Sequence, residues 1–244
     1  MNLLSKPHAN PKLAKGMQHG FLSAPLHLAP AKLSGYNVCP MSTKGCRKAC
    51  LHTAGNPIAM ERKHKARVER TRWFFQDRVA FMAKLVREIE ALNKKADKLG
   101  MIAAIRLNAT SDIRFEAIPC VRGGVNFANV MCAFPFTTFY DYTKLPNRRN
   151  IPNNYKLTFS LSENNDTQAL AALANGMNVA AVVNVKKNEE MPISFDILGR
   201  SFPVLDGDMD DLRFTDPRGV IVGLRPKGKA KQDKTGFVRS VTNA

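Results

Sequence analysis

The segment Met101–Asp112, MIAAIRLNATSD, passes from an apolar run into a polar cluster within a few residues. Its first part, Met101–Leu107, is apolar enough for a strand that is buried on both faces of a parallel sheet. In folds built from such strands, functional side chains gather at the carboxyl ends of the strands, because those ends open on one side of the sheet. The segment therefore predicts an α/β fold with a polar site after this strand.

Further apolar runs of strand length occur along the chain. We predict strands at residues 35–38, 101–107, 137–142, 155–160, 178–185, 202–205 and 220–224. An amphipathic helix over about residues 59–99 and an Ala-rich helix at 166–175 lie between them. This alternation favours a (β/α) barrel, closed or partly closed and similar to a TIM barrel, with a doubly wound open sheet as the alternative. The predicted organisation is an extended basic arm, residues 1–34, followed by one barrel domain, residues 35–244.

Polar residues follow nearly every predicted strand, and the series predicts a shared pocket. Polar residues after one strand alone are weak evidence for a pocket, because Asn, Asp and Ser are common turn residues. The pocket candidates are Asn108, Ser111, Asp112, Asp141, Tyr142, Lys144, Ser160, Glu163, Asp206 and Asp208. The sequence assigns no catalytic role to any one of them.

Three of the five cysteines lie in the segment Cys39–Cys50, CPMSTKGCRKAC, which we call the cysteine loop. Soft thiolate ligands select zinc or iron–sulfur clusters, and the basic side chains within the loop favour the thiolate form. We predict that Cys39, Cys46 and Cys50 hold a 4Fe–4S or 3Fe–4S cluster, with a structural zinc ion as the alternative. A fourth ligand could come from His52, Cys120 or Cys132, of which Cys132 lies in an apolar stretch typical of a core.

The chain is strongly basic, with 37 Lys and Arg against 20 Asp and Glu and a formal net charge of +17. Residues 1–60 contain seven basic and no acidic side chains. This excess predicts a polyanionic partner, such as nucleic acid, bound through the basic N-terminal third, although a solvated surface gives the same composition. A zinc-stapled nucleic-acid-binding protein without catalysis is therefore the alternative to an iron–sulfur protein.

Several function classes lack their usual motifs. The sequence has no phosphate-binding loop of the type GxxxxGK[ST] and no dinucleotide fingerprint GxGxxG. It has no apolar stretch long enough to cross a membrane, and residues 1–15 lack the apolar core of an export signal. We therefore expect a protein of the cytoplasm without a membrane partner.

Short motifs spread along the chain carry a resemblance to a known family. They include Asn37-Val38-Cys39-Pro40, Arg106-Leu107-Asn108, Tyr140-Asp141-Tyr142 and Asp206-Gly207-Asp208. Over about residues 30–237 the chain resembles the phage family labelled gene product eighty-eight, which implies expression in the cytoplasm of a bacterial host. The cysteine loop, spaced C-x6-C-x3-C, is also similar in placement to that of the radical S-adenosylmethionine barrels, which implies a 4Fe–4S cluster and redox or radical-type chemistry.

Overall fold

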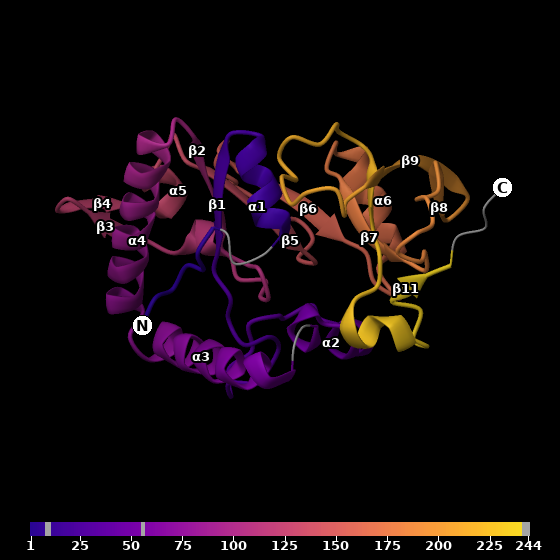
Figure 1. Cartoon of the computed structure of the whole chain (residues 1–244), viewed down its shortest axis with the longest axis horizontal. Coiled ribbons are helices and arrows are strands. Elements are labelled where there is room, and N and C mark those ends of the chain that lie inside the picture. The colour runs from indigo at the N-terminus through magenta and orange to yellow at the C-terminus, as the bar shows by residue number, and fades with distance from the viewer. Residues whose placement is uncertain (8–10, 55–56, 241–244) are drawn as a thin grey trace.

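A long open β-sheet crosses the molecule, with helices packed against it and a further helical layer beneath it (Figure 1). The computed structural model describes residues 1–7, 11–54 and 57–240. The strands are β1 (Phe21–Pro25), β2 (Ile102–Arg106), β3 (Cys120–Arg122), β4 (Val125–Phe127), β5 (Thr138–Thr143), β6 (Tyr155–Ser160), β7 (Val179–Val183), β8 (Ser194–Ile197), β9 (Arg200–Asp206), β10 (Ile221–Leu224) and β11 (Val238–Arg239). The helices are α1 (Pro11–Gln18), α2 (Lys44–Lys48), α3 (Pro57–Gln76), α4 (Arg78–Lys98), α5 (Val130–Ala133) and α6 (Asp166–Ala174), with 3-10 turns η1 (Leu51–Thr53), η2 (Phe115–Ala117) and η3 (Gly228–Gln232).

The strand order of the sheet is β1-β2-β5-β6-β7-β10-β9-β8. All neighbouring pairs are parallel except β8–β9, which is antiparallel. β11 pairs in parallel with the second half of β7, whereas β6 pairs with its first half. The C-terminal segment therefore enters the sheet where β6 and β7 separate, and this brings residues 228–239 next to the carboxyl ends of the strands.

The predicted (β/α) barrel is wrong, because the described sheet ends at β1 on one side and at β8 on the other. The parallel strands β1, β2, β5, β6, β7 and β10 do lie in chain order, as they would in a barrel. A barrel closes when its last parallel strand pairs with its first. Here the hairpin β8–β9 occupies the outer edge of β10, so this edge cannot pair with β1. The fold is a mixed α/β arrangement around an open sheet.

The N-terminal segment also differs from the prediction. Residues 1–34 were expected to form an extended arm, but they contain α1 and β1, and β1 pairs with β2 along its whole length. The expected strand at 35–38 is irregular, so β1 is the first strand and the cysteine loop follows it at a distance.

The long predicted helix is divided in two at Asp77. The carboxylate of Asp77 accepts a hydrogen bond from the backbone N–H of Ala80 at 3.0 Å, which caps α4 and ends α3. α4 then buries a stripe with helical spacing against the sheet, and Gly100, with a positive φ of 63°, ends the turn that follows it. The stripe consists of Phe81, Met82, Leu85, Val86, Ile89, Leu92 and Ala96.

Two large hydrophobic clusters fill the interior, one between α3, α4 and strands β1, β2 and β5, and one around α6 and β7. A third, smaller cluster joins Ala49 in the cysteine loop to Ala230 and Phe237 in the C-terminal segment. The cysteine loop is therefore packed between α3 and the C-terminal segment, beneath the sheet (Figure 1). No helix in the described ranges is long and apolar enough to cross a membrane.

Candidate functional site

Glu163, which follows β6, anchors the start of the cysteine loop helix. Its carboxylate accepts hydrogen bonds from the hydroxyl of Thr43 and from the backbone N–H of Gly45, both at 2.7 Å. The Thr43 hydroxyl in turn accepts a hydrogen bond from the N–H of Cys46 at 3.1 Å and caps α2. Glu163 was predicted to line a pocket, and in the structure it fixes the position of Cys46.

Gly45 lies where no larger residue fits. A Cβ atom at this position would lie 2.2 Å from the Thr235 hydroxyl and 2.8 Å from both carboxylate oxygens of Glu163. The side chain of Cys46 packs on the opposite side against the small cluster formed with Ala230 and Phe237. The segment after β6, the cysteine loop and the C-terminal segment are therefore in close contact around α2.

Cys39 is held from two sides. Its sulfur accepts a hydrogen bond from the backbone N–H of Ala31 at 3.3 Å and donates to the carbonyl of Thr110 at 3.7 Å. The N–H of Asp112 also donates to the carbonyl of Val38 at 2.7 Å. The polar segment after β2, which was predicted to line a pocket, therefore positions the first cysteine.

The three thiols of the cysteine loop lie close enough to affect one another electrostatically. The pKa of the Cys39 thiol is raised to about 12, mainly by burial and in smaller part by the neighbouring Cys50 and Cys46, while the hydrogen bond from Ala31 opposes the rise. Burial also raises the pKa of Cys50, while the cations Arg67 and Lys144 act in the opposite direction. The loop thus brings three partly buried thiols together beside two positive charges.

Arg67 of α3 is a partly buried cation without a full set of partners. Its Nη1 atom is buried and has no hydrogen-bond partner among the described residues. Burial lowers the pKa of Arg67, whereas the Cys50 thiolate raises it, so this guanidinium lies near the thiols. The Nδ1 atom of His52 is likewise buried and unpartnered within the described part of the chain. An anionic group held by the thiols would offset the cost of burying these groups.

The remaining cysteines lie elsewhere. Cys120 is buried on β3, and Cys132 is exposed on α5. Burial raises the pKa of the Cys120 thiol, and the nearby Cys132 raises it to a smaller extent. Among the described residues, no group of three or more His, Cys, Asp or Glu side chains is arranged to hold a metal ion.

A buried polar network joins the ends of β2 and β5. The carboxylate of Asp141 accepts hydrogen bonds from the N–H of Asn108 at 2.8 Å and from the hydroxyl of Tyr155 at 2.9 Å. The side-chain oxygen of Asn108 accepts from the hydroxyl of Ser111 at 2.8 Å. Since Asp141 and Asn108 are each only 2% exposed, these predicted pocket residues connect strand ends inside the protein.

Asp112 and Lys144 extend the connection toward the cysteine loop. The carboxylate of Asp112 accepts hydrogen bonds from the hydroxyl of Thr143 at 2.8 Å and from the N–H of Lys144 at 2.7 Å. The ammonium group of Lys144 donates to the hydroxyl of Ser160 at 2.6 Å. Lys144 is thus directed across the strand ends, where its charge reaches Cys50.

Replacing Asp141 with Asn should make stability less sensitive to pH. Burial raises the pKa of Asp141 to about 7, although the Arg106 charge opposes this, whereas an unfolded aspartate titrates near pH 3.9. Because the folded pKa is the higher one, this carboxylate costs stability progressively as pH rises from about 4 to about 7. We measure the free energy of unfolding with urea. The difference between Asp141→Asn and wild type should therefore shift in favour of the variant as pH rises over this interval. The free energy of unfolding of the exposed control Asp196→Asn should depend on pH as that of wild type does. If the curve of Asp141→Asn against pH also runs parallel to that of wild type, the raised pKa of Asp141 is contradicted.

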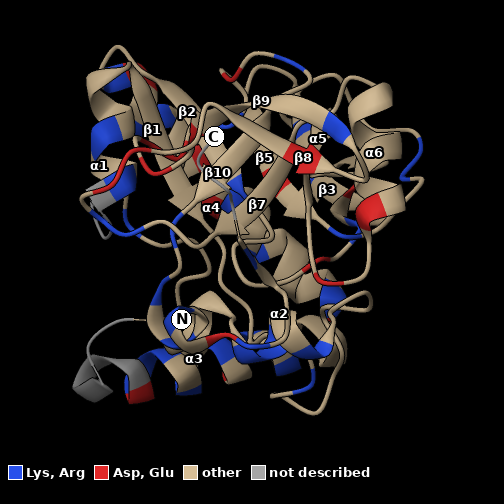
Figure 2. Cartoon of the chain, turned by 90° about the vertical axis from the view of Figure 1, so that its right-hand side faces the viewer, with Lys and Arg blue, Asp and Glu red and all other residues tan. Residues whose placement is uncertain are grey.

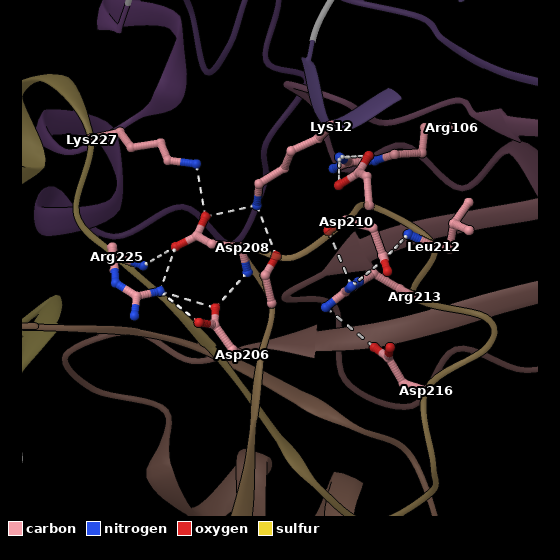
Figure 3. A network of polar contacts seen from close by, with 12 residues as sticks. Lys12, Arg106, Asp206, Asp208, Asp210, Leu212, Arg213, Asp216, Arg225 and Lys227 are labelled. Carbon is pink, nitrogen blue, oxygen red and sulfur yellow. Dashed lines mark hydrogen bonds and ion pairs between the residues drawn. The ribbon is translucent and has the colours of Figure 1, made fainter. Parts of the chain in front are cut away.

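The acidic segment after β9 pairs with cations from three parts of the chain (Figure 3). The carboxylate of Asp208 contacts the ammonium groups of Lys12 and Lys227, each at 2.8 Å. Burial alone would raise the pKa of Asp208, but these partners hold it well below its usual range. The Arg225 guanidinium binds both carboxylate oxygens of Asp206, at 3.0 and 2.8 Å. These predicted pocket residues are therefore ion-paired and bind α1 and the C-terminal segment to the sheet.

A second part of this region surrounds Arg213. Its guanidinium contacts Asp210 at 2.8 Å and Asp216 at 3.4 Å. Arg106 of β2 binds Asp211 at 3.0 Å and lies over the ring of Tyr142 at 4.9 Å. Figure 3 shows Arg106 and Arg213 in this region, and Tyr142, the last of the ten predicted pocket residues, packs beneath the guanidinium of Arg106.

The ten predicted residues therefore fall into separate groups. One cavity of about 610 Å³ lies between the cysteine loop and the C-terminal segment, and a second of about 450 Å³ lies near η2. None of the ten is among the residues that line these two cavities in the described part of the chain. Arg67 was not identified from the sequence. The pattern that could have indicated it is helical spacing, because Arg67 lies on the same face of α3 as the buried Thr71 and Phe74.

Fold and site together define an α/β protein whose open sheet carries a three-cysteine loop beneath its strand ends. The family model described as Gene product 88 matches residues 2–241, and the chain belongs to this family. The family predicted from the short motifs is thereby confirmed. No curated protein and no solved structure matches the chain.

Proposed function

We propose that the protein is an iron–sulfur protein in which Cys39, Cys46 and Cys50 hold a 4Fe–4S or 3Fe–4S cluster. What supports the proposal is that the three partly buried thiols lie within electrostatic range of one another and that Cys50 lies near Arg67, whose Nη1 atom lacks a partner within the described residues. The thiols form no ready-made metal site in the described structure, so cluster binding requires them to draw closer together. Thiolates are the usual ligands of such clusters. A buried cation next to them would stabilise their negative charge and donate the hydrogen bond that Nη1 lacks at present.

The residues around the thiols have distinct roles in this proposal. The N–H of Ala31 donates to the Cys39 sulfur, and such hydrogen bonds raise the reduction potential of a cluster. Arg67 and Lys144 add positive charge beside Cys50 and favour the reduced state in the same way. A 4Fe–4S cluster held by these three thiolates would leave one iron without a protein ligand, and that iron could bind a small molecule; a 3Fe–4S cluster would serve electron transfer alone. The likeness to radical S-adenosylmethionine enzymes then concerns the cysteine loop alone, since the sheet is open.

A zinc-stapled protein is the second candidate, and one observation favours it. The Nδ1 atom of His52 is buried without a hydrogen-bond partner in the described ranges, and His52 follows Cys50 closely in the chain. Three thiolates and one imidazole form a common structural zinc site. In that case the metal would cross-link the cysteine loop to η1, which carries His52, and would have no catalytic role.

Metal and sulfide analysis of protein purified without air decides between these candidates. We expect iron and acid-labile sulfide in equal amounts for a 4Fe–4S cluster, or in a ratio of three to four for a 3Fe–4S cluster, with a broad absorption band in the visible range that fades on reduction. Colourless protein with one zinc ion per chain, or protein without metal, would overturn the proposal. Because thiolate ligands require a reducing compartment, the proposal also places the protein in the cytoplasm of the phage host.

A further inference from the structure

The cavity beside the cysteine loop is lined mainly by cations. Its volume is about 610 Å³, and it lies between α2 with η1 on one side and η3 with the following turn on the other. Its lining residues are Arg47, Lys48, His52, Thr53, Lys229, Gln232, Asp233, Lys234 and Thr235. Four cationic side chains and a single carboxylate therefore line this cavity.

These cations are not neutralised by the protein. Lys48, Lys229 and Lys234 form no ion pair among the described residues, in contrast to the nearby Lys227, which binds Asp208. The one carboxylate, Asp233, is occupied by its own turn, since it accepts hydrogen bonds from Thr235 and Val238. The acidic residues that could have balanced the charge are instead paired in the network around Asp208 (Figure 3). The positive charge of the cavity is therefore open to a ligand.

The basic surface continues beyond the cavity. Figure 2 shows Lys and Arg residues along α3 and around α2, in the layer beneath the sheet. On α3 the side chains of Arg62, Lys63 and Lys65 are exposed together with those of Glu61 and Glu69, and on α2 the side chain of Lys44 is exposed, so this layer carries a net positive charge. A surface of this length exceeds what a single phosphate group can cover. Repeated phosphate groups along a backbone match it, because a nucleic acid presents negative charges at short, regular intervals.

We propose that the cavity lined by Arg47, Lys48, Lys229 and Lys234 binds backbone phosphates of a nucleic acid that continues along α3. Lysine ammonium groups on flexible stems suit contacts with phosphate and carry no base specificity. Arg47 and Lys48 lie between Cys46 and Cys50, so the bound strand would pass at the edge of the cysteine site. The inference does not depend on whether the thiols hold iron, zinc or no metal.

A pair of charge-reversal variants tests the proposal. We compare Lys229→Glu/Lys234→Glu with Lys94→Glu/Lys98→Glu, which changes the net charge equally on exposed positions at the far end of α4. Binding of a fluorescein-labelled single-stranded DNA oligonucleotide is measured by fluorescence anisotropy at several salt concentrations. The cavity variant should weaken binding by roughly tenfold or more, and its slope of log affinity against log salt should fall by about 1.4, two phosphate contacts at about 0.7 each.

The control variant should change the affinity by less than about threefold and leave the slope unchanged. Equal effects of the two variants would show that only overall charge matters and would overturn the proposal, as would absence of any binding by the wild-type protein. Displacement of the oligonucleotide by inorganic phosphate at constant ionic strength would instead indicate a site for free phosphate, against the proposal. Unchanged metal content in the cavity variant separates this test from that of the cysteine site.

Discussion

Replacing Cys39 with alanine is expected to reduce the bound iron to background when the protein is purified without air. Cys39 lies within electrostatic range of Cys50 and Cys46, and in the proposed cluster each of the three thiolates would hold a different iron. With one ligand removed, the remaining two thiols cannot retain a cluster against loss to solvent. Iron and sulfide per chain, measured beside wild type, give the result directly.

Two further variants make the Cys39 experiment specific. Cys132 is an exposed cysteine on α5, so Cys132→Ala removes a thiol without touching the loop and should keep the full iron content. Cys39→Ser keeps a hydroxyl that can still accept from Ala31 and donate to Thr110, so its fold should survive while iron is lost. Full iron content in both Cys39 variants would exclude this residue as a ligand.

The sequence predicted the inner strands well and the edges of the sheet poorly. The runs at 101–107 and 178–185 became β2 and β7, because a mostly apolar segment of this length has few alternatives to a buried strand, and the alternating run at 155–160 became β6. β1 lies at an edge and ends in Pro25, and a proline at such a place weakens the strand pattern. β11 has only two residues, and its pairing with β7 is visible only in three dimensions.

Closure of the sheet depended on pairings that no local pattern encodes. Strands in chain order fit both a barrel and an open sheet, and the decision lies in which strand pairs with the outer edge of β10. The hairpin β8–β9 takes that place, although it precedes β10 in the chain. The sequence pattern shows that these segments are strands, but it does not show which neighbour each of them selects.

In the candidate site, too, local sequence patterns were predictable, whereas contacts between distant segments were not. The spacing of the three cysteines predicts a shared cluster site, and that prediction remains a hypothesis. The roles of Glu163 and Asp112 were not accessible, because each acts on a segment far away in the chain, Glu163 on Thr43 and Asp112 on Val38. Polar residues at strand ends were interpreted as a pocket, but burial and mutual hydrogen bonds make most of them structural.

Replacing Gly45 with alanine is expected to destabilise the protein by about 3 kcal/mol, toward the upper end of the cost of overpacking. Helix propensity alone predicts the opposite sign, a gain of about 1 kcal/mol, because Gly45 lies within α2 and its φ is not positive. The added methyl group would meet the Thr235 hydroxyl at 2.2 Å and the Glu163 carboxylate at 2.8 Å. That carboxylate cannot withdraw without losing its hydrogen bonds to Thr43 and Gly45, so steric exclusion outweighs propensity.

Urea denaturation of Gly45→Ala and of the matched control Gly16→Ala measures this balance. Gly16 lies in α1, and a Cβ there would meet the end of the Leu212 side chain at 3.2 Å and the Phe21 carbonyl and Ser23 hydroxyl at an ordinary 3.7 Å, so the stability of Gly16→Ala should remain within about 1 kcal/mol of wild type. If Gly45→Ala is as stable as the control, the loop is not clamped between Glu163 and Thr235. If it is destabilised as expected, it should also lose iron, because α2 carries Cys46 and cannot move without displacing that thiol from Cys39 and Cys50.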